Sequence, residues 1–268
     1  MKIHNPIKNN HKEDILGNHS HTQRDPLSEI LIPQYYRGRI VFKADPTQLA
    51  KEALKDICPT NAFEKSQTMQ FSVDHGKCIT CGKCSDEFPE FISVENKFAR
   101  SVKNRNSLLE ISTGEKAISD KSYEEIGHDL KNKIQKLFGR SLAIRQVDAG
   151  SCNGCEIEIA ALNNPIYDIE RFGISFVASP RHADVLLVTG PASRNMEIAL
   201  KRTYDATPDP KIVVAVGACA CSGGIFGDTY ATTEGIDKIV PVDVFIPGCP
   251  PRPQALIYGL FLALNKKF

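Results

Sequence analysis

Cysteine is the residue type in this chain whose number and spacing could do chemistry. The chain has nine cysteines among 268 residues, and deprotonated thiols are strong metal ligands. In chain order they are Cys58, Cys78, Cys81, Cys84, Cys152, Cys155, Cys219, Cys221 and Cys249. Several are separated by only two residues, a spacing typical of metal ligation rather than of a disulfide framework. We therefore expect reduced cysteines that bind metal, as in a reducing compartment such as the cytoplasm.

The first set of four cysteines resembles half of the motif pair of bacterial two-cluster ferredoxins. Those proteins carry two copies of C-x-x-C-x-x-C-x-x-x-C-P, and the fourth cysteine of each copy binds the cluster of the other copy. The retained cysteines here are Cys58, Cys78, Cys81 and Cys84, and the positions without cysteine are Gln48, Lys51, Leu54 and Phe88. By this rule the four retained cysteines would all bind one cluster. The four positions without cysteine correspond to the ligands of the other cluster. We predict one 4Fe-4S cluster on the retained set.

Zinc is the alternative metal for this set, because C-x-x-C is also a zinc spacing. Three overlapping thiols separated by two residues each, with the distant pair Cys58-Pro59, fit a cluster better than a tetrahedron of paired zinc knuckles. A zinc-binding interaction module is therefore the less favoured interpretation.

The other cysteines lie in three loops that each follow an apolar run. Residues 142–147 precede the loop with Cys152 and Cys155, residues 211–216 precede the loop with Cys219 and Cys221, and residues 240–246 precede Cys249. Apolar runs of this length between helical stretches indicate buried strands of a parallel sheet. Loops at the carboxyl ends of such strands share one edge, where open α/β sheets bind ligands. We expect the three loops to converge on a second metal site.

The same pattern predicts an α/β fold with a doubly wound, flavodoxin-like parallel sheet over residues 141–268. Further strands are expected at residues 174–177 and 185–188, and helices at 157–162, 196–203 and 254–264. The chain has no glycine-rich phosphate loop of either usual type. We therefore expect no nucleotide or flavin.

Three further regions are expected before the sheet. Residues 1–34 form a polar extension that contains His4, His11, His19 and His21, for which a metal role ranks below a disordered tail. Residues 35–97 form a small α+β ferredoxin-like domain whose limited core needs the cluster as a cross-link. Residues 98–140 contain a polar linker and an amphipathic helix that begins with the capping box of Ser122 and Glu125.

Longer segments resemble a known family. YRGR (36–39), CPTNAF (58–63) and GKCITCGKC (76–84) are similar to ferredoxin-type subunits of membrane-bound hydrogenases and of complex I. VDAGSCNGCEIEIAAL (147–162) and the three cysteine loops resemble the small subunit of group 4 nickel–iron hydrogenases, which include formate hydrogenlyase. That family is homologous to the 20 kDa subunit of complex I. The resemblance favours the hydrogenase branch, because complex I subunits have two adjacent cysteines where this chain has the spaced pair Cys152 and Cys155.

The resemblance implies a role for each candidate residue. The second 4Fe-4S cluster would be held by Cys152, Cys155, Cys219 and Cys249, since the family ligand follows a Gly-Ala pair. Cys221 would then be a buried small residue, and Cys221 as the ligand in place of Cys219, or a swap between the two, is the alternative. Glu156 matches a position implicated in proton passage, with a helix-capping carboxylate as the alternative. Arg181, His182 and Asp184 resemble a stretch near the cluster, with a surface ion pair as the alternative.

The implied function is electron relay through two 4Fe-4S clusters to or from a nickel–iron centre in a partner large subunit. Membrane-arm subunits and a ferredoxin or ferredoxin-like protein are the other expected partners. A complex I-like subunit that passes electrons to quinone is the alternative function. The chain has 33 Lys and Arg against 32 Asp and Glu, which gives no basic field for nucleic acid. With no apolar span or signal sequence visible, we expect a cytoplasmic chain held peripherally at the inner membrane by its partners.

Overall fold

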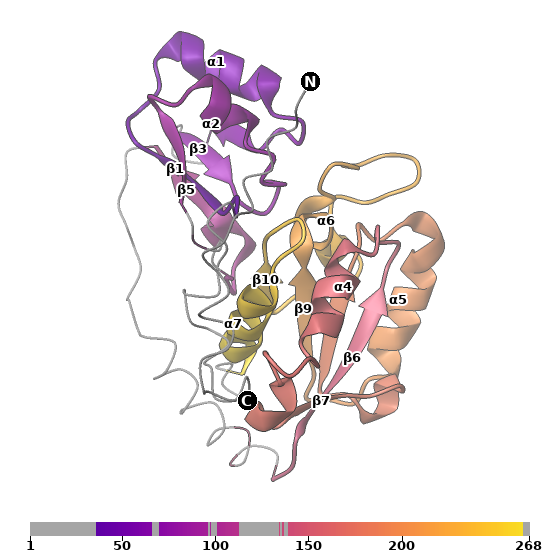
Figure 1. Cartoon of the computed structure of the whole chain (residues 1–268). Helices are drawn as coiled ribbons and strands as arrows, with labels where there is room; N and C mark the ends of the chain where they lie inside the picture. The colour runs from indigo at the N-terminus through magenta and orange to yellow at the C-terminus, as the bar shows by residue number, and fades with distance from the viewer. Residues whose placement is uncertain are drawn as a thin grey trace, which may run out of the picture.

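The computed structural model describes residues 36–65, 70–95, 97, 101–112, 134, 136 and 139–264. These residues form two units, an N-terminal unit (36–97) and a sheet unit (139–264), joined by a bridging segment (101–112) (Figure 1). The expected polar extension lies outside the described residues. So does the expected amphipathic helix, apart from the isolated positions Ile134 and Lys136.

The sheet unit alternates strands with helices along the chain. Its elements are β6 (Leu142–Asp148), α4 (Gly154–Ala161), β7 (Ile174–Phe176), β8 (Val185–Thr189), α5 (Arg194–Ala206), β9 (Ile212–Val216), α6 (Gly217–Ser222), β10 (Val244–Ile246) and α7 (Pro253–Ala263). The five strands are all parallel and lie in the order β10-β9-β8-β6-β7. Counted along the unit, this is the flavodoxin-like order. The predicted doubly wound fold is confirmed.

Helices cover both faces of this sheet because its strands are apolar on both sides. In β9, Ile212 and Val214 pack into one core with α4 and α7, whereas Val213 packs into the other core with α5 and α6. Figure 1 shows α4 and α7 together on the near side of the strands and α5 at the far side. The apolar run at 240–246 contributes only the short strand β10, and its earlier residues lead in from a 3₁₀ turn, Ile236–Lys238.

The N-terminal unit is a smaller α+β structure. Its elements are β1 (Arg39–Phe42), α1 (Gln48–Ile57), β2 (Phe63–Lys65), β3 (Phe71–Asp74), α2 (Lys83–Glu87) and β4 (Ile92–Glu95). β1 pairs antiparallel with β4, and β2 pairs antiparallel with β3. Its core is built around Leu54 and the stacked rings of Phe63 and Phe71, whose centroids are 5.7 Å apart.

The bridging segment is ordered, although its polar composition predicts a linker. Val102 forms an antiparallel bridge with Phe245 of β10, so the segment begins on the edge of the large sheet. A 3₁₀ turn, Arg105–Leu108, follows, and β5 (Leu109–Ile111) then pairs with β3 of the N-terminal unit. Leu108 is buried in the core of the sheet unit. Backbone pairing and a few apolar side chains therefore hold this segment, and composition alone does not reveal them.

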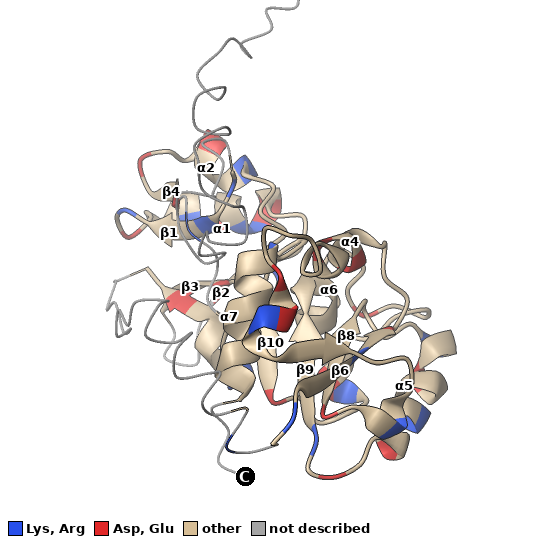
Figure 2. Cartoon of the chain, turned by 60° about the horizontal axis from the view of Figure 1, so that its bottom comes forward, with Lys and Arg blue, Asp and Glu red and all other residues tan. Residues whose placement is uncertain are grey.

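Charges of both signs are spread over both units (Figure 2). Helix α5, for example, carries Lys, Arg, Asp and Glu within its 13 residues. This agrees with the formal net charge of +1. Among the described residues, no helix combines the length and apolar character that crossing a membrane requires.

Candidate metal centres

Four cysteines of the N-terminal unit surround one cavity, and we call Cys58, Cys78, Cys81 and Cys84 site 1. The cavity contains about 360 Å³ of empty space including its open mouth, and all four cysteines line it. Cys58 caps the end of α1, Cys78 and Cys81 lie in the loop after β3, and Cys84 lies in α2. Segments on both sides of the β2–β3 hairpin thus bring the predicted ligands together.

Backbone amides point at two of the site 1 sulfurs. The N–H of Ala62 donates to Sγ of Cys58 at 3.2 Å, and the N–H of Thr80 donates to Sγ of Cys78 at 3.4 Å. Such donors stabilise negative charge on sulfur and tune the potential of an iron–sulfur cluster. These two contacts would stabilise thiolates bound to a metal centre.

Burial opposes the ionisation of two of the site 1 thiols. Burial, with added repulsion from neighbouring cysteines, raises the pKa of Cys78 to about 11 and that of Cys84 to about 12. A bound metal centre reverses this effect, because its positive charge stabilises the thiolates. The donor set, the cavity and the N–H···S contacts fit an iron–sulfur cluster.

The positions of the absent ferredoxin cluster are filled by ordinary side chains. Leu54 is completely buried in the core of the N-terminal unit, and Phe88 packs against the same core. Gln48 donates a hydrogen bond to Glu52 on the helix surface. In the second motif copy the chain is a loop up to Lys83, but in the first copy α1 is helical through the equivalent stretch. Without a cluster to encircle, this stretch forms a helix that packs its apolar face.

The second group of cysteines lies at one edge of the large sheet, and we call Cys152, Cys155, Cys219 and Cys249 site 2. The first two follow β6, Cys219 follows β9 in α6, and Cys249 follows β10. All three loops leave the carboxyl ends of parallel strands, as predicted. Asp148 shapes the first loop, since its Oδ1 accepts hydrogen bonds from the N–H groups of Gly150 at 2.8 Å and Ser151 at 2.7 Å.

The sulfurs of site 2 influence one another electrostatically. Burial raises the pKa of Cys219 to about 11, and repulsion from Cys249 and Cys152 adds to this shift. Burial, Glu156 and the other three site 2 thiols raise the pKa of Cys155 as well. As in site 1, a cationic metal centre would offset this repulsion.

Two glycines of the loop after β9 leave room for the sulfurs. Gly217 has φ +85°, and a Cβ added there would lie 2.6 Å from Sγ of Cys155. A Cβ on Gly224, at φ +55°, would lie 2.9 Å from Sγ of Cys219. Glycine is therefore required at both positions by backbone conformation and by the closeness of a sulfur.

Cys221 is separate from site 2. It is buried in the core between the sheet and helices α5 and α6. Its Sγ faces the carbonyl oxygens of Ile246 at 3.6 Å and Ala215 at 3.9 Å. This position agrees with the expectation that Cys221 is a structural residue and that Cys219 is the ligand from this loop. The ligand assignment itself stays a prediction.

Glu156 lies in the first turn of α4 and turns toward the sheet. Its Oε1 accepts a hydrogen bond from the hydroxyl of Thr189 at the end of β8. Its Oε2 is buried and has no hydrogen-bond partner among the described residues. The capping alternative is weakened, because the side chain is engaged with the sheet rather than with the N-terminal amides of its own helix.

The stretch with Arg181, His182 and Asp184 is not at the cluster edge. It precedes β8, whereas the cysteine loops follow the strands, so the two lie at opposite ends of the sheet. Asp184 instead accepts two hydrogen bonds from Arg140, both at 2.8 Å. The expected position of this stretch near the cluster is therefore wrong. Asp184 forms an ion pair with Arg140.

Within the part of the chain that the structure describes, no group of three or more His, Cys, Asp or Glu side chains has the geometry to hold a metal ion. The choice of a cluster over zinc at the two sites stays a prediction from the cysteine spacing.

Comparison with known proteins covers mainly the sheet unit. Residues 152–263 match the family described as NADH ubiquinone oxidoreductase, 20 Kd subunit. A probable membrane-bound hydrogenase subunit mbhJ of Pyrococcus furiosus is 54% identical over 134 residues, which is 50% of this chain and 80% of that protein. Formate hydrogenlyase subunit 7 of Escherichia coli is 54% identical over 136 residues, 51% of this chain and 53% of that protein, so the chain spans about half of its length.

A complex I protein is similar to the same region. An NADH-quinone oxidoreductase subunit of Citrifermentans bemidjiense is 53% identical over 112 residues, which is 42% of this chain and 65% of that protein. The chain therefore belongs to the family of the 20 kDa subunit of NADH ubiquinone oxidoreductase, which it shares with subunits of membrane-bound hydrogenases.

Proposed function

We propose that this chain is the electron-transfer small subunit of a multisubunit nickel–iron hydrogenase of the formate hydrogenlyase or energy-converting type. The observation that carries this proposal is the convergence of Cys152, Cys155, Cys219 and Cys249 at the carboxyl edge of the sheet. It occurs in a chain 54% identical over 134 residues to a membrane-bound hydrogenase subunit. The catalytic nickel–iron centre would lie on the partner large subunit.

Site 1 and site 2 would each hold one 4Fe-4S cluster through four thiolates. When bound, such clusters carry single electrons without making or breaking covalent bonds to a substrate. The protein's own contribution is the environment of the sulfurs. At site 1 the N–H groups of Ala62 and Thr80 stabilise charge on sulfur, and at site 2 Gly217 and Gly224 let the backbone approach the sulfurs closely.

The open side of site 2 supports a large-subunit partner at that edge. Cys152 and Cys249 are exposed in the isolated chain, although both belong to the predicted ligand set. Apolar side chains next to the cysteine loops are exposed as well, with Ile157 at 64% and Phe226 at 46%. Exposed apolar groups beside a functional edge are typical of protein interfaces. A large subunit that covers this edge would bury them and exclude water from site 2.

Glu156 is the candidate for proton relay beside site 2. Its Oε1 accepts a hydrogen bond from the Thr189 hydroxyl, and its buried Oε2 has no hydrogen-bond partner among the described residues. A carboxyl in this position could pass protons between the chain and the large subunit.

Site 1 would exchange electrons with the remaining partners, a ferredoxin or a ferredoxin-like subunit. Membrane-arm subunits would hold the complex on the cytoplasmic face of the inner membrane, with this chain peripheral. The relative from Pyrococcus furiosus is named as a subunit of a membrane-bound hydrogenase, which supports this arrangement.

Metal analysis and electron paramagnetic resonance of the native complex test the proposal. We expect about eight irons per chain, nickel in the purified complex, and two cubane signals after reduction. A complex I-like subunit, which the similarity to an NADH-quinone oxidoreductase favours as the second candidate, would give iron without nickel and quinone-linked activity. A zinc module would be colourless and would give no paramagnetic signal. Absence of iron would refute electron transfer by this chain.

A further inference from the structure

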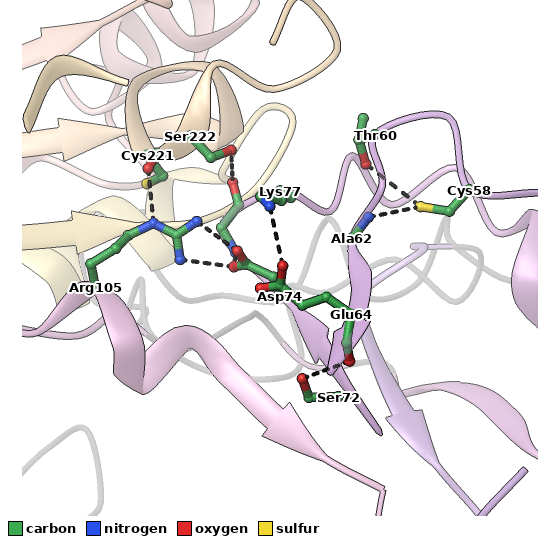
Figure 3. A network of polar contacts seen from close by, with 11 residues as sticks. Cys58, Thr60, Ala62, Glu64, Ser72, Asp74, Lys77, Arg105, Cys221 and Ser222 are labelled. Atoms are coloured by element: carbon green, nitrogen blue, oxygen red, sulfur yellow. Dashed lines mark hydrogen bonds and ion pairs between the residues drawn. The ribbon is translucent and has the colours of Figure 1, made fainter. Parts of the chain in front are cut away.

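Arg105 of the bridging segment contacts both cysteine-bearing units at once. Its guanidinium donates two hydrogen bonds to the carboxylate of Asp74 at the end of β3, at 2.8 and 2.7 Å. Its Nε donates a third to the backbone oxygen of Cys221 in α6, at 2.9 Å. Figure 3 shows the guanidinium between these partners, with the N-terminal unit on one side and the sheet unit on the other.

Each partner of Arg105 is attached closely to one metal site. The backbone oxygen of Asp74 accepts a hydrogen bond from the N–H of Cys78 at 3.1 Å, so Asp74 anchors the ligand loop of site 1. Cys221 lies in the same short helix as Cys219, two residues after this predicted ligand of site 2. One path from one ligand loop to the other therefore passes through the side chain of Arg105.

A second contact between the same two loops reinforces this connection. The hydroxyl of Ser222 donates to the backbone oxygen of Gly76 at 2.8 Å, and the N–H of Gly76 donates to Oδ1 of Asp74 at 2.8 Å. A Cβ on Gly76 would lie 2.8 Å from the guanidinium carbon of Arg105, which shows how closely the turn packs on it.

The ion pair of Arg105 and Asp74 is sufficiently buried to fix the relative orientation of the two side chains. The Asp74 side chain is only 3% exposed and that of Arg105 is 22% exposed. A planar guanidinium that binds a carboxylate through two parallel hydrogen bonds has a defined orientation. Moving either group away from the other would leave a buried charge without its partner, which is energetically costly. The pair therefore favours one relative position of its two residues.

We propose that Arg105 is a positioning residue that fixes the ligand loop of site 1 against the ligand loop of site 2. The two sites then work as one electron-transfer unit inside a single chain. This inference rests on the proposed function. Other contacts remain when Arg105 is changed: Arg252 of the sheet unit lies 5.3 Å from the ring centroid of Tyr36 in the N-terminal unit, and Val102 of the bridging segment pairs with Phe245 of the sheet unit. Loss of Arg105 therefore loosens the relative position of the sites without separating the units.

The test uses the full chain in its native complex with R105Q, R105K and S222A. R140Q is the matched control, because Arg140 also makes a two-bond ion pair with an aspartate, and that aspartate, Asp184, belongs to the sheet unit. Two reduced clusters at a fixed short distance broaden or split each other's paramagnetic signals, and this interaction falls steeply with distance. The readouts are iron content, the signal of each cluster alone and the interaction when both are reduced.

We expect native protein and R140Q to show the interaction with full iron content. R105Q should keep both individual signals but lose the splitting, and R105K should not restore it, because lysine lacks the planar fork. Hydrogen exchange at the amides of Gly76 and Cys78 should quicken in R105Q and S222A and stay unchanged in R140Q.

An unchanged splitting in R105Q with full iron overturns the inference. If R105Q fails to retain both clusters, the S222A variant provides the test. A weaker splitting of the paramagnetic signals in S222A supports the inference. Unchanged splitting together with unchanged hydrogen exchange at Gly76 and Cys78 overturns it. A native chain without iron would instead refute the proposed function, and the two failures are therefore distinguishable.

Discussion

The two metal sites differ in how the chain builds them. Site 1 takes its cysteines from residues 58–84, within a unit of short elements and one small core. Site 2 takes its cysteines from loops between residues 152 and 249, and the strands that carry these loops are packed between two cores. We therefore expect site 1, which is built from local segments, to depend on its metal for structure, and site 2, which is built from sheet-edge loops, to stand on a scaffold that is stable without metal.

Removal of iron gives the largest expected contrast between the sites. After oxidative chelation and re-reduction of the thiols, we expect the amides of β2 and β3 to lose their protection against hydrogen exchange. The small core of the N-terminal unit cannot hold these strands without the cluster as a cross-link. The amides of β8 and β9 should stay protected. Equal protection of β3 and β8 after iron removal would contradict the comparison.

Substitution of the two cysteines in the loop after β9 tests whether site 2 is assigned correctly. C219S should reduce the iron content by about four per chain, the load of one cubane, and should abolish one of the two paramagnetic signals. C221S should keep both, because its sulfur faces the carbonyl of Ile246 in the core. The circular dichroism of both variants should be native, since the sheet does not depend on the metal. The reverse pattern of iron loss would show that Cys221 is the ligand.

Much of the fold was predictable because its signals are local. The runs that became β8 and β9 are apolar on both faces, and runs of this kind between helical stretches indicate a parallel sheet. The cysteine loops then followed from the rule that ligands lie at the carboxyl ends of the strands. The bridging segment was missed because its order comes from backbone pairing with β3 and β10, which polar side chains do not reveal.

The candidate site was only partly predictable for the same reason. Cysteine spacing reveals ligands, because a cluster constrains residues that are close in sequence. Arg105 has no such pattern, since its partners Asp74 and Cys221 are 31 and 116 residues away in the chain. The stretch around Asp184 was wrongly expected near the cysteines. It lies before β8, and the direction of that strand puts it at the end of the sheet opposite the cysteines.

Leu54 tests how the vacated half of the ferredoxin-like motif is stabilised. L54A should lower the free energy of unfolding of the N-terminal unit by about 2–5 kcal/mol, because it opens a cavity where the side chain is fully buried. L49A in the same helix is the control, since Leu49 is 79% exposed and its loss should change stability by less than about 0.5 kcal/mol. Denaturant unfolding of the iron-loaded chain, followed by the absorbance of the clusters, measures both. Equal stability of the two variants would mean that packing has not replaced the lost cluster.

Gly217 gives the smallest and most specific test, because it separates backbone strain from crowding at site 2. G217A and G227A both place a side chain at positive φ, +85° and +60°, which costs each variant about 1 kcal/mol. Only the Cβ at position 217 meets a sulfur, that of Cys155 at 2.6 Å, whereas nothing lies within 4 Å of the Cβ at position 227. We expect G217A alone to change the paramagnetic line shape of site 2, with the signal of site 1 unaltered in both variants. If G217A leaves the line shape of site 2 unchanged, the sheet does not fix the position of Cys155. Site 2 would then depend on its metal as much as site 1 does.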